Sequence, residues 1–475
     1  MAASNKAPRP ARLALACAAL AFAAPLLAQP APIGEVEYVR GAGALERPGE
    51  APRVMGNGSA IAQGELLTTS SAGFAVVKLN DGTRMTMRPN SSMRIDEFVL
   101  AQPDRQDSLV MNLLRGGLRV VTGAITRRPG AGRLQTPTAT VGIRGTDFDA
   151  RICAEDCRGE SRRPPPPVAQ ASVTTVLPAA ARVAQLSGEL TITGENGVRR
   201  AVAAGGPAFK GDTIETPAGA NAVLVFRDDT RITVAPGTRI RIDDFTWDAR
   251  APADGGFAVN LLKGGIRALT GALARARPQA VRFTTSTATV GIRGTGVDML
   301  CEGACAGEPG GGANDGFFIF TWRGEVGVTS ARAPDRIVIV PVGAAARLAG
   351  GDLQPVLIQS IPDTMRDLPR PDGVPIDLNR LFGATRQDTP EDGLYVFVRD
   401  GHLAVESGGQ TRDIARGEAL FASLAGDRVI RLENVPAFIQ GDSTPRPDRV
   451  DARGAQLLDL LSLGLRQRAN LVCRP

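Results

Sequence analysis

Aromatic side chains and the residue types that most often perform catalysis are scarce in this chain. Phe, Trp and Tyr make up 4% of its 475 residues, and it has a single histidine. That residue, His402, follows Asp400 and Gly401, a sequence typical of an exposed turn rather than of a general base. No Gly-x-Ser-x-Gly motif and no phosphate-binding Gly-rich loop is present. We therefore expect no enzyme activity, no catalytic residue, no cofactor and no metal site.

Long apolar runs are equally rare. One occurs near the N-terminus, where three cations precede an Ala/Leu-rich stretch over residues 13–27 and Ala28 is small enough for cleavage. This order predicts a secretory signal peptide over residues 1–28, with an uncleaved anchor as the alternative. No other stretch approaches the roughly 18 apolar residues of a membrane span. We expect a mature chain without a transmembrane segment, periplasmic or secreted.

Charge of one sign is not in large excess. The formal net charge of +6 falls to +3 when the three cations of residues 1–28 leave with the signal peptide. A nearly neutral chain of this length lacks the strongly basic surface that nucleic-acid binding requires. We therefore expect no nucleic-acid partner.

Four of the six cysteines form two Cys-x3-Cys pairs. The pairs are Cys153 with Cys157 and Cys301 with Cys305. An oxidising compartment favours one disulfide within each pair. The alternative is one zinc site made of all four thiolates, which requires the two pairs to meet in a reducing environment. Cys473 is left over, as a free thiol or an intermolecular bridge.

Much of the chain follows the period of two that is typical of strands. Arg84–Met87 and Arg231–Val234 alternate polar and apolar residues, as do Ser92–Ile95 and Arg239–Ile242. The 55 glycines and 34 prolines supply turns between such segments. Short strands at regular spacing predict an all-β fold, built as a β-helix-like roll or a sandwich.

One segment occurs almost unchanged in two places. Thr138–Thr146 reads Thr-Ala-Thr-Val-Gly-Ile-Arg-Gly-Thr and returns as Thr287–Thr295. A repeat over this distance indicates a duplicated domain. We predict two repeated β domains, over residues 33–160 and 180–350. A proline-rich linker is predicted between them, over residues 161–179, because consecutive prolines favour an extended segment.

The C-terminal third contains a shorter relative of these repeats. Leu394–Val405 resembles Phe317–Val328, since each is an apolar run, a polar turn with glycine and an alternating segment. This resemblance predicts a partial β module over residues 391–435, after a second linker over residues 360–390. A C-terminal helix is predicted over residues 452–472, where leucines share one face.

Three segments recur in the same order in both repeats. They are Leu-x-x-Gly-Gly-(Leu/Ile)-Arg, ending at Arg119 and Arg267, then Thr-Gly-Ala, and then the closing nine-residue motif. Together they resemble the FecR domain, over about residues 60–150 and 210–300. The resemblance implies a periplasmic all-β domain. In the founding members it implies a membrane-spanning regulator that senses a loaded outer-membrane transporter and controls a cytoplasmic sigma factor.

The order of parts departs from that of those regulators. They carry a cytoplasmic anti-sigma domain and a membrane helix before the FecR domain, whereas only residues 1–12 precede the apolar stretch here. We therefore expect the resemblance to carry over the fold and to leave the function open.

The closing motif has a physical interpretation. Val141 and Ile143 alternate inward, and the motif glycines allow a turn or a close backbone approach. The motif arginines could bind carboxylates across a turn, with Asp147, Asp149 and Asp298 nearby, or could instead contact an anionic ligand or partner. The motif residues considered are Gly142, Arg144, Gly145, Thr146, Gly291, Arg293, Gly294 and Thr295.

Adjacent charges recur at matching places in the two repeats. Asp96-Glu97 and Asp243-Asp244 each precede a phenylalanine. Neighbouring strand residues point to opposite faces, so we interpret these pairs as solvated strand ends rather than as a glycosidase or calcium site. Arg127-Arg128 and the Arg275–Arg277 segment form basic loops that could contact lipopolysaccharide phosphates or an acidic partner, or solvent alone.

The combined features favour a non-catalytic, exported binding or scaffolding module whose partner is an envelope protein or a glycan. Two alternatives stay open. The first is a periplasmic sensor that relays an envelope signal to a sigma factor through a membrane partner. The second is a glycan-binding envelope protein, suggested only by the all-β architecture. The sequence identifies no ligand and no oligomeric state.

The cysteine pattern makes a direct prediction. Each Cys-x3-Cys pair should be oxidised in the mature protein, because an oxidising compartment favours a disulfide within each pair. Closing such a short loop then contributes about 2 kcal/mol on the chain-entropy model. Mass spectrometry of peptides from unreduced protein should show an intact Cys153–Cys157 link. Free thiols at these two positions would contradict it, and reduced protein is the control.

Overall fold

The fold comes from a computed structural model. It describes residues 31–449 apart from residues 102–104, 129, 163–177, 196, 313–314, 361 and 364–367. The predicted signal peptide, most of the proline-rich linker, the predicted C-terminal helix and Cys473 lie outside the described residues. Among those described, strands form two large sheets with few short helices, which confirms the all-β prediction with repeated domains.

The first sheet contains 17 strands in the described part of the chain. Their bounds are β1 Gly34–Arg40, β2 Gly43–Glu46, β3 Arg53–Val54, β4 Ala60–Ile61, β5 Leu66–Thr69, β6 Phe74–Leu79, β7 Arg84–Met87, β8 Ser92–Val99, β9 Ser108–Arg115, β10 Gly117–Val121, β11 Gly132–Gln135, β12 Thr140–Cys153, β28 Ala384–Thr385, β29 Gly393–Ser407, β30 Gln410–Ala415, β31 Ala419–Ser423 and β32 Val429–Leu432.

The second sheet contains 15 strands, counted over the same described residues. Their bounds are β13 Ala181–Ser187, β14 Thr191–Thr193, β15 Arg199–Ala201, β16 Pro207–Ala208, β17 Thr213–Glu215, β18 Asn221–Phe226, β19 Arg231–Val234, β20 Arg239–Thr246, β21 Gly256–Leu269, β22 Val281–Thr284, β23 Ala288–Glu302, β24 Gly316–Ser330, β25 Ala333–Pro341, β26 Ala345–Leu348 and β27 Val356–Ile358. The α-helices are α1 Glu155–Ser161, α2 Ala272–Ala276, α3 Leu378–Phe382 and α4 Ala437–Gln440.

Alternation along the strands builds the core. In β9, Leu109, Met111 and Leu113 are fully buried while the residues between them are partly exposed. Each sheet encloses one large apolar cluster, and burying such side chains is the main favourable term in folding. The first cluster draws on β29, β30 and β31 as well as on the N-terminal strands.

The long strand β12 organises the first sheet. Its residues 140–143 pair with β11, and its residues 147–151 pair with β10. One strand thus belongs to two runs of strands, β1–β6–β7–β10 and β2–β5–β8–β9–β11. The second sheet repeats this plan with β23, which pairs with β22 and then with β21.

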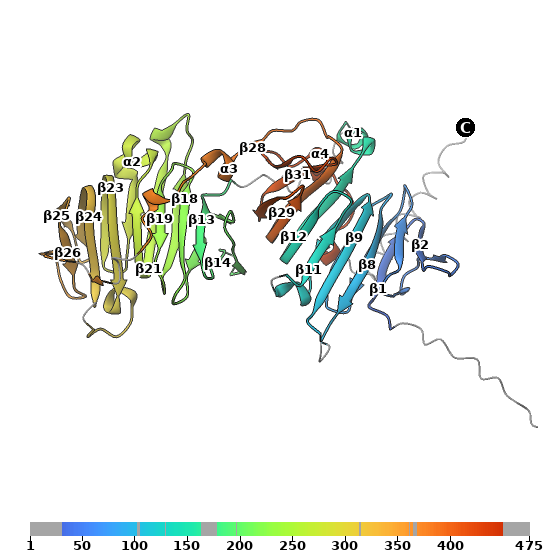
Figure 1. The fold of residues 1–475 in the computed structure, drawn as a ribbon, viewed down its shortest axis with the longest axis horizontal. Helices are drawn as coiled ribbons and strands as arrows, with labels where there is room; N and C mark the ends of the chain where they lie inside the picture. Colours follow the sequence, from blue (N-terminus) through green and yellow to red (C-terminus); the bar gives the residue numbers. More distant parts are fainter. Residues whose placement is uncertain are drawn as a thin grey trace, which may run out of the picture. The chain divides into compact units, whose positions relative to one another are not determined.

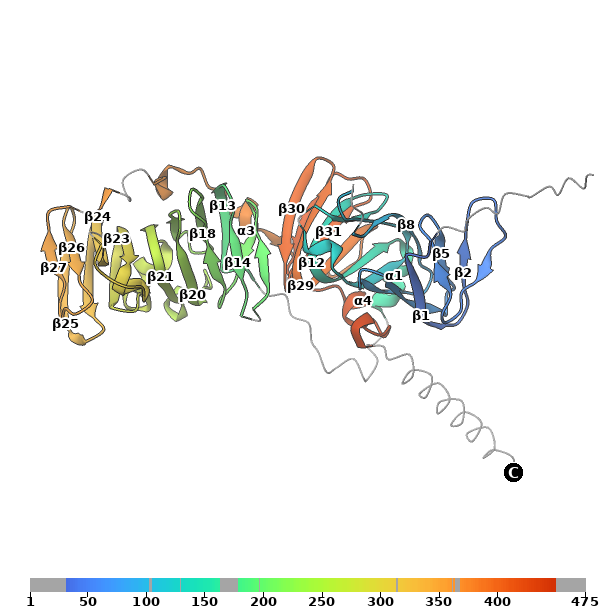
Figure 2. The same cartoon turned by 90° about the horizontal axis from the view of Figure 1, so that it is seen from below.

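The strands of residues 393–432 complete the first sheet instead of standing apart. β29 pairs antiparallel with β12 along its whole length, from Thr140 opposite Glu406 to Cys153 opposite Gly393. Figures 1 and 2 show the orange-red β29 beside the teal β12. The equivalent neighbour of β23 is β24, which follows it directly in the chain. The second sheet is therefore an insertion within the first, between β12 and β28.

The predicted partial module was inferred from the resemblance of Leu394–Val405 to Phe317–Val328. These segments are β29 and β24, the closing strands of the two sheets. The predicted linker over residues 360–390 contains α3 and β28, and β28 pairs with β32. The strand pairings thus give both segments a place in the first sheet.

Removing a buried side chain from β29 should destabilise the first sheet. Leu403 is fully buried opposite Ile143, so Leu403→Ala should cost about 2–5 kcal/mol. Hydrogen exchange of residues 140–153 should accelerate in this variant. Leu424→Ala, at a side chain that is 57% exposed, is the control. Unchanged exchange in β12 would show that residues 391–435 fold independently of the first sheet.

Candidate functional site

The closing motif forms a corner in each sheet. Between its pairings with β11 and β10, β12 bends at Gly145, where φ is +54°, and the register with β29 shifts there. Gly294 has φ of +63° at the same place in β23. A side chain at this φ strains the backbone, which is why glycine occupies both positions.

Paired threonines fix this corner. The Thr122 backbone N–H donates to the Thr146 carbonyl at 3.1 Å, and the Thr146 N–H donates to Thr122 Oγ1 at 2.7 Å. Thr270 and Thr295 repeat both bonds in the second sheet, at 3.0 and 2.9 Å. The Thr-Gly-Ala segment and the closing motif therefore recur together because they are hydrogen-bonded to each other.

The acidic residues near the motif pair with arginines outside it. Asp149 lies 2.8 Å from Arg119 and 2.6 Å from Arg399, and Asp298 lies 2.7 Å from Arg267. Asp147 pairs with Arg446 at 2.6 Å. These carboxylates therefore have partners other than the motif arginine Arg144.

Arg144 instead faces the second sheet. Its Nη1 donates to the Ala201 carbonyl at 3.4 Å, in β15. A groove of about 600 Å³ lies here. The charged residues lining it are Arg127, Arg144, Asp147, Arg199, Arg200 and Asp400. The side chain of Arg293 lies outside the described residues, as do its contacts.

Asp147 is the most perturbed carboxylate in this groove. Burial raises its pKa from 3.8 to about 6, and the positive charge of Arg446 opposes this shift. Its Oδ1 is buried without a hydrogen-bond partner. Desolvation without full compensation disfavours the ionised form, which accounts for the direction of the shift.

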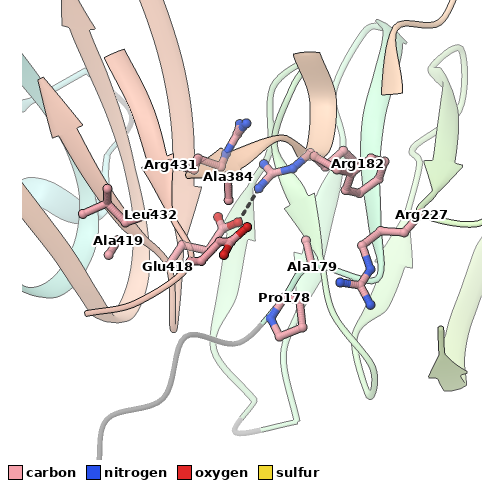
Figure 3. A pocket seen from close by; sticks show the side chains of 11 residues that line it. Pro178, Ala179, Arg182, Arg227, Ala384, Glu418, Ala419, Arg431 and Leu432 are labelled. Atoms are coloured by element: carbon pink, nitrogen blue, oxygen red, sulfur yellow. Dashed lines mark hydrogen bonds and ion pairs between the residues drawn. The ribbon is translucent and has the colours of Figure 1, made fainter. Parts of the chain in front are cut away.

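A pocket of about 380 Å³ opens where the closing strands of the first sheet meet the first strands of the second. Figure 3 shows Arg182 of β13 directed at Glu418, which lies just before β31. Both side chains are almost fully buried, at 2% and 6% exposure. Burying such a pair is costly, and further hydrogen bonds offset part of that cost. Arg182 Nη1 donates to the Gly205 carbonyl at 2.9 Å, and Glu418 accepts from the Ala415 N–H at 3.0 Å.

Two further arginines line this pocket. Arg431 of β32 donates to the carbonyls of Leu381 and Asp413, and burial lowers its pKa to about 10, with the charge of Arg182 adding to the effect. Burial also lowers the pKa of Arg227. The Nε atoms of all three arginines are buried without a hydrogen-bond partner. The pocket therefore concentrates positive charge that is incompletely compensated.

His402 lies beside this region, and its predicted exposure was wrong. Its side chain is fully buried, and Nε2 lies 3.0 Å from Asp413 Oδ1 in the neighbouring strand β30. The Asp400-Gly401 turn sequence does not end the strand here, because β29 continues past the corner alongside β12. Pairing with distant strands decided the exposure of this residue.

The remaining candidates fall at separate places. Asp96 pairs with Arg94 and Glu97 with Arg105, whereas Asp243 pairs with Arg241 and Asp244 with Lys210, so neighbouring carboxylates take different partners. The sulfurs of Cys153 and Cys157 lie 2.01 Å apart, and those of Cys301 and Cys305 lie 2.06 Å apart, which is disulfide distance. Each bridge joins the C-terminal end of the corner strand to the short helical segment that follows it.

Two absences hold for the described residues. No group of three or more His, Cys, Asp and Glu side chains converges there in a way that could hold a metal ion. None of the helices in that part of the chain is long and apolar enough to cross a membrane.

The chain thus belongs to the class of proteins with a duplicated all-β domain, and in each copy one long strand bends at a glycine. The family model described as FecR protein matches residues 65–160 and 212–306, one region in each sheet. The chain therefore carries two copies of the FecR domain. Both matches end shortly after the corner strand, so the closing strands β24 and β29 lie outside them.

Comparison with other proteins adds little beyond this family. No curated protein sequence matches the chain. Two crystal structures of a "putative anti-sigma factor" from Parabacteroides distasonis ATCC 8503 are each 15% identical, with a TM-score of 0.23. Each alignment covers 31% of this chain and 58% of the solved chain, so little more than half of that protein's length is spanned.

The raised pKa of Asp147 makes the stability depend on pH. The folded state keeps this proton where the unfolded chain releases it, so the stabilisation is complete below pH 3.8 and is lost as pH rises through about 6. The loss amounts to about 3 kcal/mol for a shift of this size. Urea unfolding of the protein and of Asp147→Asn should therefore show wild type losing stability relative to the variant between pH 4 and 7.

A matched control is available for this experiment. Asp388→Asn replaces a carboxylate that is 69% exposed, so its difference from wild type should stay nearly constant over the same pH range. If Asp147→Asn behaved like Asp388→Asn, burial would not control the titration of Asp147.

Proposed function

We propose that this chain is a non-catalytic, exported binding module of the cell envelope, and that its binding site is the pocket lined by Arg182, Arg227 and Arg431. The pocket itself carries the proposal. It combines guanidinium groups with buried, unpartnered Nε donors, and such donors are costly unless a ligand or water satisfies them.

The lining indicates the chemical class of the ligand. Glu418 is already engaged by Arg182, and the other acidic lining residue, Glu433, is exposed. The remaining wall is apolar, formed by Pro178, Ala179, Phe382, Ala384, Ala419 and Leu432. Pockets with an apolar wall and a few polar groups that fix orientation are typical of small-molecule sites. A carboxylate on a short apolar chain, free or as part of a larger envelope molecule, fits both features.

The FecR matches support a second candidate. Founding members of that family are regulators, so a sensor that relays an envelope signal through a membrane partner is compatible with two FecR domains. In this alternative the paired closing strands present a surface to a protein rather than to a small molecule. Export to the periplasm, as expected from residues 1–28, belongs to both candidates, and a glycan-binding role is a third.

The anion-binding proposal predicts discrimination by charge. In isothermal titration calorimetry the mature protein should bind hexanoate at least tenfold more tightly than hexanamide, because only the carboxylate pairs with the arginines. Arg227→Gln should weaken hexanoate binding by about tenfold or more, since Arg227 has no carboxylate within ion-pair distance among the described residues.

The control variant is Arg386→Gln, at an arginine side chain that is 70% exposed. It should bind hexanoate as wild type does. Equal binding of acid and amide, or no binding of either, would overturn the proposed site. Specific recovery of one membrane protein from solubilised envelopes would then favour the sensor, and binding of neutral glycan fragments would favour the glycan-binding role.

A further inference from the structure

Each sheet ends in an equivalent set of strands, but these strands are covered in the first sheet and exposed to solvent in the second. In the first sheet β29 pairs with β30 and β31, and in the second sheet β24 pairs with β25 and β26. The pairing registers align Leu403 with Val326 and Asp413 with Ile339. Residue-by-residue comparison of the two ends is therefore possible within one chain.

The end of the first sheet is covered by the second sheet. Asp413 in β30 is 8% exposed, its carbonyl lies 3.5 Å from Arg182 Nη1, and β30 packs against β16. Glu418 is buried by its ion pair with Arg182. In the first copy, this end of the sheet is thus covered by another part of the same chain.

The equivalent end of the second sheet is open and apolar. Ile337 is 65% exposed, Ile339 52% and Val342 62%. In β27, which pairs with β26, Val356 is 58% exposed and Leu357 55%. Exposed apolar side chains gathered in one place mark interaction sites, because contact with water is unfavourable for them.

The same positions are polar or charged in the first sheet. The pairing registers place Ile337 and Ile339 where the first sheet has Thr411 and Asp413, and continuing them along the chain places Val342 where it has Arg416. Ala344 takes the place of Glu418 in the same alignment. The face that meets a charged partner in one copy has therefore become a face that suits an apolar partner in the other.

We infer that this open end binds the same end of a second copy of the chain, with β25 pairing antiparallel to its symmetry mate. Among the described residues β25 pairs with β24 alone, so its other edge presents free backbone groups. Antiparallel pairing centred on Val338 places Ile337 opposite Ile339 of the partner. The register of β25 is irregular before Ile337, and its regular part, residues 337–341, carries no charged side chain, so no like charges face each other there.

A head-to-tail contact with the first strands of another copy fits less well. The first strands of the two sheets differ in charge at one equivalent position. Glu35 of β1 pairs with Lys78, and Arg182 of β13 pairs with Val225. These pairings are equivalent, so Glu35 occupies the position that Arg182 has in the second sheet. The pair of Arg53 and Glu65 stands where β15 and its neighbours have Arg200 and Asp212. Covering Glu35 with Ile339 and Ala344 would bury a carboxylate without a counter-charge, which is unfavourable. Two apolar ends carry no such penalty.

Analytical ultracentrifugation of the mature chain tests the inference. The protein should sediment as a concentration-dependent dimer. The test variant is Ile339→Asp, because the first sheet has an aspartate, Asp413, at the equivalent position. This variant should raise the dimer dissociation constant by about a hundredfold or more, because it puts two unpaired carboxylates into the contact. Leu424→Asp, at a side chain that is 57% exposed in the first sheet, should leave the dimer unchanged.

A cross-link tests the geometry independently of affinity. Val338→Cys in a Cys473→Ser background should form a disulfide-linked dimer on mild oxidation, since the two Val338 positions face each other at the symmetry axis. Circular dichroism verifies that each variant is folded.

Several results would overturn the inference. The protein could sediment as a monomer at all concentrations, or form a dimer that Ile339→Asp does not weaken. The Val338→Cys variant could fail to cross-link. The protein could instead form open-ended assemblies that Val54→Asp, a substitution in β3, dissociates. The last result would establish the head-to-tail contact instead. None of these outcomes bears on hexanoate binding at the arginine pocket.

Discussion

The pairing of β12 with β29 is the contact on which the rest of the structure depends. It runs from Thr140 to Cys153 in one strand and from Glu406 to Gly393 in the other. Through it, residues that lie far apart in sequence complete a single core. The second sheet reaches the same arrangement with β23 and β24, which follow one another in the chain. One domain is therefore inserted within its own homologue. The loop-closure entropy of joining the last two long strands is larger in the first sheet, because β12 and β29 lie much further apart in sequence than β23 and β24.

The corner within these strands explains why the family motif is so similar in the two copies. Gly145 and Gly294 supply positive φ angles, and a Cβ at Gly401 would lie 2.1 Å from the Gly145 carbonyl oxygen. The threonines of the motif hold the corner through backbone and hydroxyl bonds. These positions serve the fold in both sheets. Differences in binding therefore have to arise elsewhere, at the ends of the sheets, where the two copies differ in charge and apolarity.

The two sheet ends have equivalent strand pairings, and they differ mainly in the charge of their side chains. In the first sheet, the Glu418 carboxylate pairs with Arg182, and the Asp413 backbone carbonyl accepts a hydrogen bond from Arg431, in a nearly dry environment. Such an interface is specific because breaking one partner leaves a buried charge uncompensated. In the second sheet, the equivalent residues are apolar and exposed, and they need no counter-charge. The same fold thus ends in a charge-paired contact in the first sheet and in an exposed apolar surface in the second.

Local physical chemistry made part of this structure predictable. Alternation in segments such as Arg239–Ile242 requires one buried and one exposed face, so such strands could be predicted from the sequence. The duplicated motif predicted two domains, and the family model matches both. Short spacing placed each cysteine beside its partner, because residues four apart can meet without help from the fold.

The sequence by itself determined that this protein is all-β, duplicated and closed by a glycine corner, since period, turn chemistry and repetition are properties of neighbouring residues. Only the tertiary structure decided which distant strand lies beside which. That choice buried His402, turned Arg144 towards Ala201, joined residues 393–432 to the first sheet and left Ile337 and Ile339 in contact with water. Two strands pair when complementary edges meet in space, so the local pattern of a strand does not predict which distant strand it will pair with.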